Sequence, residues 1–415
     1  MKQHQTLVVI GGGAAGFFCA VNAARMHPGL KVFIVEKTTK ILSKVKVSGG
    51  GRCNVTNGCR DLQQMSAGYP RGGTFLRKAF HHFFTSDTVR WFEERGLKLK
   101  TEPDGRMFPV SDSSQSVINC LLAEAAKYGV EILYNREVQT LTRETDLWKL
   151  RFKNNDSLEA DFVCVASGGF QRSEQVGWLQ NTGHTIVNPV PSLFTFNLPG
   201  NPINQLMGIV VPEATVKIQS LKYKETGPLL ITHWGLSGPV ILRLSAWAAR
   251  ELNQLDYHFT VLVNWLPAMD IDHLKEQLQQ ARLHQGSMKI YNSNFFKLPV
   301  RLWHFLLKNA GVDGDCRIAD MTARAQQQLI RDLLQFPFVV SGKTTFKEEF
   351  VTAGGIALQE INHHTMESKL QANLFFVGEI MDVDGITGGY NFQHAWTSGF
   401  IAASAIAQKC RAVAY

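Results

Sequence analysis

The feature that most constrains this chain is a glycine-rich turn between an apolar strand and a helix near the N-terminus. Residues 7–10 are an apolar, β-branched run, residues 11–16 read Gly-Gly-Gly-Ala-Ala-Gly, and residues 17–26 have helical character. A second apolar strand ends at Glu36, 20 residues beyond Gly16. Strand, turn, helix and spaced carboxylate together predict a Rossmann-like α/β domain that binds a dinucleotide.

The glycines of this turn have separate physical roles. Gly11 suits the sharp turn, Gly13 lets the backbone approach a pyrophosphate, and Gly16 permits close packing of helix on strand. The helix N-terminus then faces the phosphates. Glu36 would accept hydrogen bonds from ribose hydroxyls and would repel a 2′-phosphate. The alternative interpretation is a glycine-rich turn without a ligand.

A second glycine-rich segment, near the C-terminus, indicates which dinucleotide is bound. Residues 373–379 form another apolar strand closing on Gly378 and Glu379, and a glycine-rich stretch at 385–391 leads into a helical segment at 392–407. A nicotinamide dehydrogenase needs no such closing segment. A flavin needs a carboxylate or amide for its ribityl chain and backbone amides for its pyrimidine edge. The predicted cofactor is therefore FAD.

Five segments, spread over nearly the whole chain, match one known family in order. They are residues 11–16, 46–57, 232–239, 352–356 and 378–391. The Ser-Gly-Gly-Gly-Arg-Cys-Asn run within 46–57 is highly specific. Through these segments the chain resembles the BaiN/RdsA-like family of FAD-dependent oxidoreductases, which is related in architecture to the two-dinucleotide-domain and fumarate-reductase flavoenzymes.

The resemblance implies the reduction of carbon–carbon double bonds conjugated to a carbonyl. The substrate is either a uracil ring of large-subunit ribosomal RNA, which becomes dihydrouridine, or a small steroid-like enone. In both cases a hydride goes to one alkene carbon and a proton to the other. No second Gly-x-Gly-x-x-Gly follows a strand. We therefore expect NAD(P)H to dock transiently in the same cleft, reduce the flavin and leave before the substrate binds.

The fingerprint and the resemblance together predict a tight, non-covalent FAD site and no metal site. The expected cofactor-binding residues are Gly11, Gly13, Ala14, Ala15, Gly16, Glu36, Lys37, Ser48, Gly49, Gly50, Arg52, Asn54, Val138, Ala166, Ser167, Gly168, Gly378, Glu379, Asp382, Gly388, Gly389, Tyr390 and Asn391.

Cys53 is the first candidate for the proton donor because a thiol near a cationic group can have a tuned pKa. The alternative is that Cys53 packs as a small apolar residue. His233 and His394 are further candidates, although a lone histidine is more often structural. Arg52 could neutralise a substrate carbonyl or the negative charge that develops on the flavin.

The positive charge bears on the choice of substrate. The formal net charge is +8, and basic residues cluster with aromatic residues or glycine at 71–82, 98–100, 217–224 and 297–304. Such clusters suit phosphate contact and base stacking, although a merely solvated basic surface is the alternative. A steroid site would instead predict a deep apolar pocket. We therefore favour a uridine of 23S ribosomal RNA as the substrate and ribosomal RNA or a ribosome precursor as the partner.

Two other functions stay open at this point. One is the reduction of a small conjugated enone by the same chemistry. The other belongs to a different class, a flavin-binding or electron-transfer protein without substrate turnover.

Length and composition fit a multidomain enzyme. At 415 residues the chain is too long for a single core, and its seven cysteines lack a Cys-x-x-Cys pair, which argues against a disulfide framework, a zinc site or a redox dithiol. No apolar run is long enough to cross a bilayer, and the chain enters directly into a strand, so we expect a cytoplasmic location without membrane contact.

Composition shifts divide the chain into a discontinuous cofactor domain and two insertions. We expect the FAD-binding domain at 1–190 and 346–415, a mostly β domain at 191–268 and a helical subdomain at 269–345. Within the first domain, helices are predicted at 86–95 and 114–128, with Ser86 and Ser114 as caps.

Overall fold

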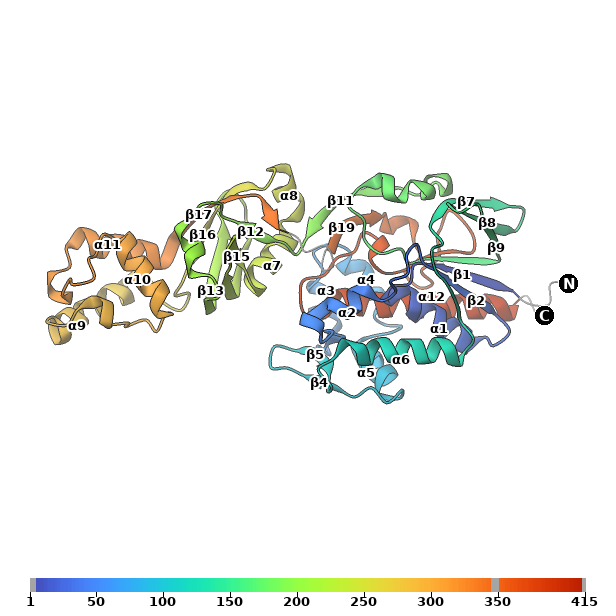
Figure 1. The fold of residues 1–415 in the computed structure, drawn as a ribbon, viewed down its shortest axis with the longest axis horizontal. Coiled ribbons are helices and arrows are strands. Elements are labelled where there is room, and N and C mark those ends of the chain that lie inside the picture. Colours follow the sequence, from blue (N-terminus) through green and yellow to red (C-terminus); the bar gives the residue numbers. More distant parts are fainter. Residues whose placement is uncertain (1–4, 345–350, 413–415) are drawn as a thin grey trace. The chain divides into compact units, whose positions relative to one another are not determined.

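A computed structural model describes residues 5–344 and 351–412 of the chain, which form two compact units (Figure 1). Unit 1 comprises residues 1–192 and 346–415, and unit 2 comprises residues 193–345. Unit 2 is thus a single insertion into the sequence of unit 1.

A five-stranded parallel sheet forms the centre of unit 1. Its order is β20-β10-β1-β2-β6, so β1 lies in the middle. Apart from the polar first residues of β1, β2 and β6, the strands are apolar because the sheet is covered on both faces. Adjacent residues such as Val8 and Val9 point to opposite faces, and both are fully buried. The strands are β1 (Thr6–Ile10), β2 (Lys31–Val35), β6 (Glu131–Leu133), β10 (Phe162–Val165) and β20 (Leu374–Phe376).

Helix α1 (Ala14–Met26) packs closely against α12 (Tyr390–Ala412) and also contacts α6 (Ser114–Lys127). A Cβ on Gly399 would lie 2.9 Å from the carbonyl oxygen of Ala15, so a glycine lets the two backbones approach. Through α12 the C-terminal part of the chain therefore packs on the N-terminal fingerprint. The other helices of unit 1 are α2 (Ser43–Val47), α3 (Leu62–Ala67), α4 (Gly73–Ala79) and α5 (Thr85–Glu93).

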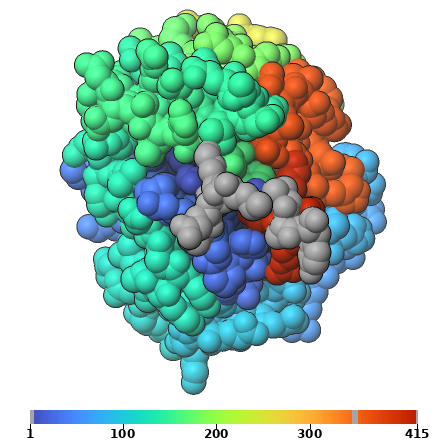
Figure 2. Space-filling view, turned by 90° about the vertical axis from the view of Figure 1, so that its right-hand side faces the viewer, coloured from blue at the N-terminus to red at the C-terminus, as the bar shows by residue number. Residues whose placement is uncertain are grey.

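Three small antiparallel sheets complete unit 1, and the teal and green atoms of one of them, β7–β9, form part of the surface in Figure 2. The strands are β3 (Thr56–Asn57), β5 (Arg106–Pro109) and β4 (Leu99–Thr101); β7 (Val138–Glu144), β8 (Leu147–Phe152) and β9 (Ser157–Ala160); and β11 (Ile186–Ser192) and β19 (Val351–Ile356).

Both predicted helix caps are wrong. Helix α5 begins one residue before Ser86, and the carboxylate of Asp87 accepts a hydrogen bond from the backbone N–H of Phe84 at 2.8 Å. Helix α6 is capped by Ser113 instead of Ser114, through a bond from the backbone of Gln115. The capping chemistry is as expected, but the residue that provides it is displaced.

Unit 2 is built around an antiparallel sheet of order β17-β16-β13-β14-β15-β12-β18. Its first and last strands are separated in sequence only by Gly342, so both edges belong to one stretch of chain and the sheet closes on itself. The strands are β12 (Thr195–Asn197), β13 (Val210–Ile218), β14 (Lys224–Ile231), β15 (Gly235–Ser237), β16 (His258–Asn264), β17 (Phe336–Ser341) and β18 (Lys343–Thr344).

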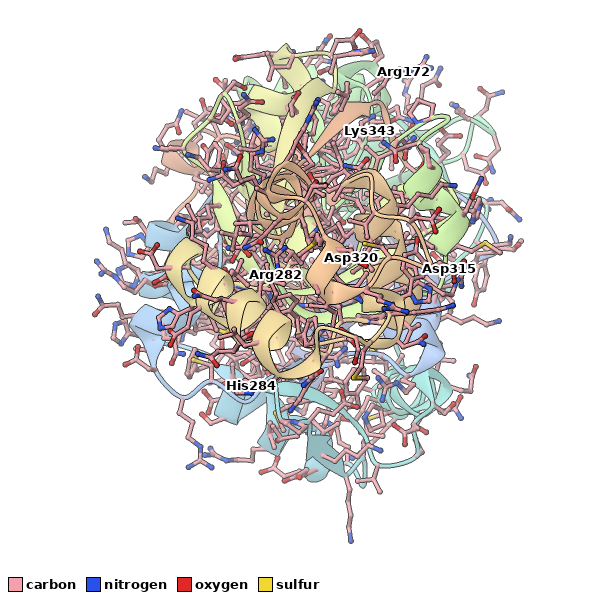
Figure 3. The ribbon with its side chains drawn as sticks, turned by 90° about the vertical axis from the view of Figure 1, so that its left-hand side faces the viewer. Arg172, Arg282, His284, Asp315, Asp320 and Lys343 are labelled. Atoms are coloured by element: carbon pink, nitrogen blue, oxygen red, sulfur yellow. The ribbon has the colours of Figure 1, made fainter. Side chains whose placement is uncertain are left out.

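The sheet and the helices of unit 2 share one hydrophobic core, so the segments that we expected as separate β and helical domains lie in a single unit. Figure 3 looks onto the helical end, where Arg282 of α9 donates a hydrogen bond to the carbonyl of Met321. A groove of about 380 Å³ beside α9 is lined by Gln280, His284 and Phe295 and contains none of the predicted site residues. The helices are α7 (Pro239–Trp247), α8 (Ala249–Gln254), α9 (Ile271–Gln285), α10 (Val300–Asn309) and α11 (Ala323–Gln335).

Candidate cofactor site

The carboxyl ends of four parallel strands bring the main predicted segments together. Strand β1 leads to Gly11, β2 to Glu36, β10 to Ala166 and β20 to Gly378. Because the strands are parallel, all four positions lie at the same edge of the sheet. Strands β2 and β10 lie on opposite sides of β1, so the strand order reverses direction at β1. This reversal is the topological switch point, where α/β sheets bind their ligands.

The three fingerprint glycines have distinct surroundings. A Cβ on Gly11 would lie 2.3 Å from the carbonyl oxygen of Ala166, and one on Gly16 would lie 2.1 Å from the carbonyl oxygen of Gly11. A Cβ on Gly13 would meet no atom within 4 Å. Two glycines therefore serve packing within the protein, whereas Gly13 borders open space. Gly13 is also the N-cap of α1 and lends no side chain to the first helical amides.

The carboxylate of Glu36 is fixed at this edge. Its Oε2 accepts a hydrogen bond from the backbone N–H of Gly12 at 3.0 Å, and its Oε1 accepts bonds from the backbone and hydroxyl of Thr38, both at 3.1 Å. The neighbouring Lys37 is exposed. Glu36 is thus oriented by the protein backbone before any ligand binds.

The strand that ends at Gly378 is held by α12 and β19. The backbone N–H of Gly378 donates to Oγ of Ser398 at 2.9 Å, and its carbonyl accepts from Nε2 of His394 at 3.0 Å. Oε1 of Glu379 accepts from the backbone of Thr352 at 2.9 Å, and its Oε2 pairs with Lys44. The C-terminal segment is therefore anchored to α12, to β19 and, through Lys44, to α2.

The two glycine-rich segments of the resemblance are in direct contact. Asn57 donates to the carbonyl of Gly388 at 3.0 Å, and the indole of Trp396 donates to the carbonyl of Val55 at 2.9 Å. A Cβ on Gly389 would lie 2.4 Å from the carbonyl oxygen of Thr56. The chain therefore brings residues 55–57 against the start of α12, where backbone amides are available to a ligand.

The Cys53 loop has an unusual backbone. The φ angles of Gly49, Gly50 and Gly51 are 58°, 68° and 85°, and that of Cys53 is 60°, in the left-handed region that a cysteine rarely adopts. Such conformations are maintained where the surroundings require them, often at functional sites. Burial raises the pKa of the Cys53 thiol to about 12, an effect partly offset by a hydrogen bond with Ser48. The thiol is therefore protonated at neutral pH.

Arg52 is oriented by the β4–β5 hairpin. Its guanidinium bonds to Glu102 at 2.7 Å, lies 3.6 Å from Asp112 and stacks over the ring of Phe108 at 4.0 Å from the centroid. The hydrogen bond to Glu102 is the main reason why the pKa of Arg52 is raised. Arg52 is half-buried and remains charged.

The two candidate histidines have different environments. His394 is buried in α12, where burial lowers its pKa to about 4, and its Nε2–H is donated to the Gly378 carbonyl. A neutral imidazole held in this way is a poor proton donor at neutral pH. His233 is an exposed residue of unit 2 and packs edge-on against Trp234. His233 is therefore the one candidate catalytic residue in unit 2, whereas Arg52, Cys53 and His394 belong to unit 1.

The remaining predicted residues lie in unit 1, on the segments already described or at their ends. Val138 is buried at the start of β7, and Tyr390 accepts a hydrogen bond at its carbonyl from the hydroxyl of Tyr69 at 2.7 Å. The side chain of Asn391 bonds to both backbone groups of Gly385, at 2.8 and 3.0 Å. Oδ1 of Asn54 is buried without a hydrogen-bond partner in the described part of the chain. Ser48, Ala166, Ser167, Gly168 and Asp382 belong to the loops at the carboxyl edge of the sheet or next to it.

Three sets of side-chain contacts that hold these segments together were not predicted. Arg71 forms a bidentate pair with the buried Asp384, which Ser192 also contacts at 2.7 Å, and this pair fixes the loop before α12. Lys44 pairs with Glu379. The amide of Gln393 accepts from the hydroxyls of Thr56 and Thr88 at 2.6 and 2.9 Å. No local motif marks these partners, which lie some hundreds of positions apart in the sequence.

No group of three His, Cys, Asp or Glu side chains in residues 5–344 and 351–412 is arranged to hold a metal ion. No helix in the same ranges is long and apolar enough to cross a membrane.

Comparisons with known proteins agree with the Rossmann-like fold. The family model described as HI0933-like protein Rossmann domain matches residues 5–405. The chain is 29% identical to a Haemophilus influenzae ribosomal RNA dihydrouridine synthase, over 99% of this chain and 100% of the relative. It is 30% identical to an Escherichia coli protein of the same name (95% and 96%) and 27% identical to a Clostridium scindens 3-dehydro-bile acid delta(4,6)-reductase (97% and 98%).

Solved structures show a likeness in fold. A 3-ketosteroid-delta4-(5alpha)-dehydrogenase from Rhodococcus jostii RHA1 superposes with a TM-score of 0.52 at 13% identity, over 98% of both chains. A flavocytochrome c3 fumarate reductase has a TM-score of 0.50 at 16% identity, over 98% of this chain and 78% of the other. At such low identity these likenesses support the fold alone.

Proposed function

This chain belongs to the HI0933-like family of Rossmann-domain proteins, a family of FAD-dependent oxidoreductases, and we propose that it reduces a uridine of 23S ribosomal RNA to dihydrouridine. The electron donor in this proposal is NAD(P)H, which docks transiently. Four features support the proposal: the fit of the cofactor, the state of the proton donor, the charge of the chain and its full-length relatives.

The residues at the carboxyl edge fit FAD. The open space beside Gly13 and the uncapped start of α1 suit a pyrophosphate, and Glu36 suits the ribose of the adenosine half. The start of α12, with Gly389 and Tyr390, suits the flavin end. When bound, FAD supplies hydride transfer between a nicotinamide and an alkene carbon.

Cys53 is the proton donor in this proposal. Its thiol is protonated at neutral pH because burial raises its pKa to about 12. The rigid, left-handed loop conformation would hold this proton in a fixed position. Arg52, oriented by Glu102, would stabilise the negative charge that develops on the substrate carbonyl. His394 would then serve to orient Gly378.

The choice of RNA as the substrate is based on the net charge of +8. It is also based on the full-length relatives that are named as ribosomal RNA dihydrouridine synthases. A polyanionic substrate makes use of positive charge, and a neutral steroid does not. The second candidate function is reduction of a small conjugated enone, which the bile-acid reductase relative favours at 27% identity.

A side-by-side comparison of the two substrates tests the proposal. Purified yellow protein and NADPH are incubated with an unmodified large-subunit rRNA transcript and, separately, with a Δ4-3-ketosteroid. We expect dihydrouridine in the RNA by mass spectrometry and little steroid reduction. Reduction of the steroid, while the RNA gains no dihydrouridine, would favour the enone reductase. Flavin reduction without turnover of either would favour an electron-transfer protein.

A further inference from the structure

A group of imidazoles and ammonium groups, all exposed except one half-buried histidine, lies outside the proposed cofactor site of unit 1. It consists of Lys78, His82, His363, His364 and Lys369, which we call the histidine–lysine cluster. Two segments far apart in the sequence supply it: α4 with the turn that follows, and the loop between β19 and β20. In Figure 2 the light blue atoms around α4 lie next to the orange-red atoms of this loop.

The three histidines of the cluster are in contact. Nε2 of His82 lies 2.9 Å from Nδ1 of His364, and the ring centroids of His363 and His364 are 4.0 Å apart. The edge of the Phe75 ring meets His363 at 6.1 Å between centroids. The cluster thus combines several cationic or ionisable groups with one half-buried aromatic ring.

Carboxylates that could neutralise the cluster are engaged elsewhere. Glu367 pairs with Lys409 and accepts from the backbone of Asn373 at 2.8 Å, and Glu360 accepts two bonds from Thr185, at 2.9 and 2.8 Å. Within residues 5–344 and 351–412, neither Lys78 nor Lys369 forms an ion pair; Nζ of Lys369 donates to the Gln359 carbonyl at 2.8 Å. Among the described residues, the two lysines of the cluster are therefore free of direct ion pairs and available to a phosphate.

We propose that the histidine–lysine cluster is a docking site for backbone phosphates of the RNA substrate. The proposal rests on the proposed function, because it assumes that the substrate is RNA. Lysine and protonated histidine bind phosphate oxygens as charge-assisted donors, and an aromatic ring can stack on an unpaired base. The cluster would position the RNA, and the cofactor site would act on one extruded base.

The location of the cluster suits this task. The residue before α4, Gly72, lies against Val383, and its neighbour Arg71 pairs with Asp384 in the segment that leads to α12. Helix α4 therefore runs from the cofactor segment to the cluster. From Gly73 to Lys78 its rise is about 8 Å at 1.5 Å per residue. The Lys78 end of the cluster is therefore between one and two helical turns from the segment that leads to the proposed flavin site.

The histidines make this docking sensitive to pH. Burial is the main reason why the pKa of His82 and the pKa of His363 lie below the usual value. Neighbouring basic groups also lower them: His364 and His81 act on His82, and His364, Lys78, Lys369 and His82 act on His363. A bound phosphate would favour the protonated rings and raise both pKa values. Binding would then take up protons, so the affinity for RNA would increase as the pH falls.

Binding of an unmodified rRNA fragment to the FAD-loaded protein tests the proposal. Fluorescence anisotropy is measured over a range of salt concentrations, at about pH 8 and about pH 6, where histidine titrates. The variants are Lys78→Ala with Lys369→Ala, and His82→Ala with His364→Ala. The control is Arg143→Ala with Arg151→Ala, which removes the same charge from two exposed positions on β7 and β8.

We expect the lysine variant to lower the slope of log affinity against log salt by about 2, one for each phosphate contact. The histidine variant should lose most of the gain in affinity at low pH, and the control should resemble the wild type in both respects. All variants should retain FAD and be reduced by NADPH as the wild type is.

The proposal is overturned if the wild type binds RNA and both cluster variants bind it with unchanged slope and pH dependence. Failure of the wild-type protein to bind RNA at any salt concentration would contradict the proposed RNA substrate itself, which distinguishes the two failures.

Discussion

The proposed chemistry depends most on Cys53. This residue has a strained backbone conformation and a fully buried thiol that is protonated at neutral pH. A proton donor of this kind contributes about 10²–10⁴-fold to a rate. We predict that Cys53→Ala lowers kcat for dihydrouridine formation by a factor in this range while the flavin spectrum stays unchanged. Cys120→Ala, on α6, removes another thiol and should leave kcat unaltered. Full turnover by Cys53→Ala would exclude this thiol as the donor.

His394 gives a prediction about stability. Its pKa is about 4 in the folded protein against 6.5 ordinarily, so folding favours the neutral ring. The resulting stability is fully present above about pH 6.5 and is lost as the pH falls towards 4. Fully lost, it amounts to about 3 kcal/mol, at 1.36 kcal/mol per pKa unit.

Urea unfolding of the FAD-loaded protein at pH 7 and at pH 5 measures this effect. His394→Gln, which can still donate to the Gly378 carbonyl, should lose less stability between these two pH values than the wild type. Equal losses would show that another group titrates.

At the scale of residues, the sequence predicts roles that depend on backbone conformation better than roles that depend on distant partners. Gly11 and Gly16 can be assigned because a Rossmann turn requires them at fixed spacing. The Arg71–Asp384 and Lys44–Glu379 pairs could not be predicted, because each joins segments that only the tertiary fold brings together.

At the scale of elements, the turn between β1 and α1 separates ligand contact from packing. We predict that Gly16→Ala destabilises the fold by about 1–3 kcal/mol, since its Cβ would lie 2.1 Å from the Gly11 carbonyl oxygen. Gly13→Ala should fold normally, because its Cβ meets open space. It should bind FAD at least about tenfold more weakly, because the added Cβ would obstruct one contact with the cofactor. Thermal unfolding and FAD titration measure the two effects. Unchanged FAD affinity in Gly13→Ala would contradict a pyrophosphate beside this residue.

The contact between β3 and α12 gives a matched pair of variants. Gly388 and Gly389 have φ angles of 117° and 92°, so alanine is strained at both positions. Only Gly389 would also clash, with the Thr56 carbonyl oxygen at 2.4 Å; Gly388 would meet Tyr390 at 3.5 Å. We predict a larger fall in melting temperature and in FAD retention for Gly389→Ala than for Gly388→Ala. Equal effects would mean that the contact does not support the site.

Element type was more predictable than element ends. The strands around the fingerprint are apolar runs with little ambiguity, and β10 returns beside β1 as the strand before Ser167 indicated. The caps of α5 and α6 were displaced because several polar side chains stand near each helix start, and only the local backbone decides which one bonds.

At the scale of the whole molecule, the resemblance to the BaiN/RdsA-like family is confirmed, and with it the Rossmann-like fold. The closed sheet of unit 2 was not predicted, because its closure depends on one strand, interrupted at Gly342, pairing with β16 on one side and β12 on the other. Long-range pairing of this kind leaves no local pattern in the sequence.

The assignment of cofactor residues also depends on long-range contacts. Two segments more than 300 residues apart, at 55–57 and 388–396, bond to each other. The sequence alone indicated that both ends of the chain serve one cofactor. The proposed roles of individual residues in that site stay predictions that the variants above can test.

The dihydrouridine content of large-subunit ribosomal RNA, in cells that lack this protein, tests the central claim most directly. We predict that one dihydrouridine is absent from this RNA and that purified wild-type protein with NADPH restores it, whereas Cys53→Ala does not. An unchanged dihydrouridine content, with a protein that NADPH still reduces, would contradict the claim and direct the search to small conjugated enones.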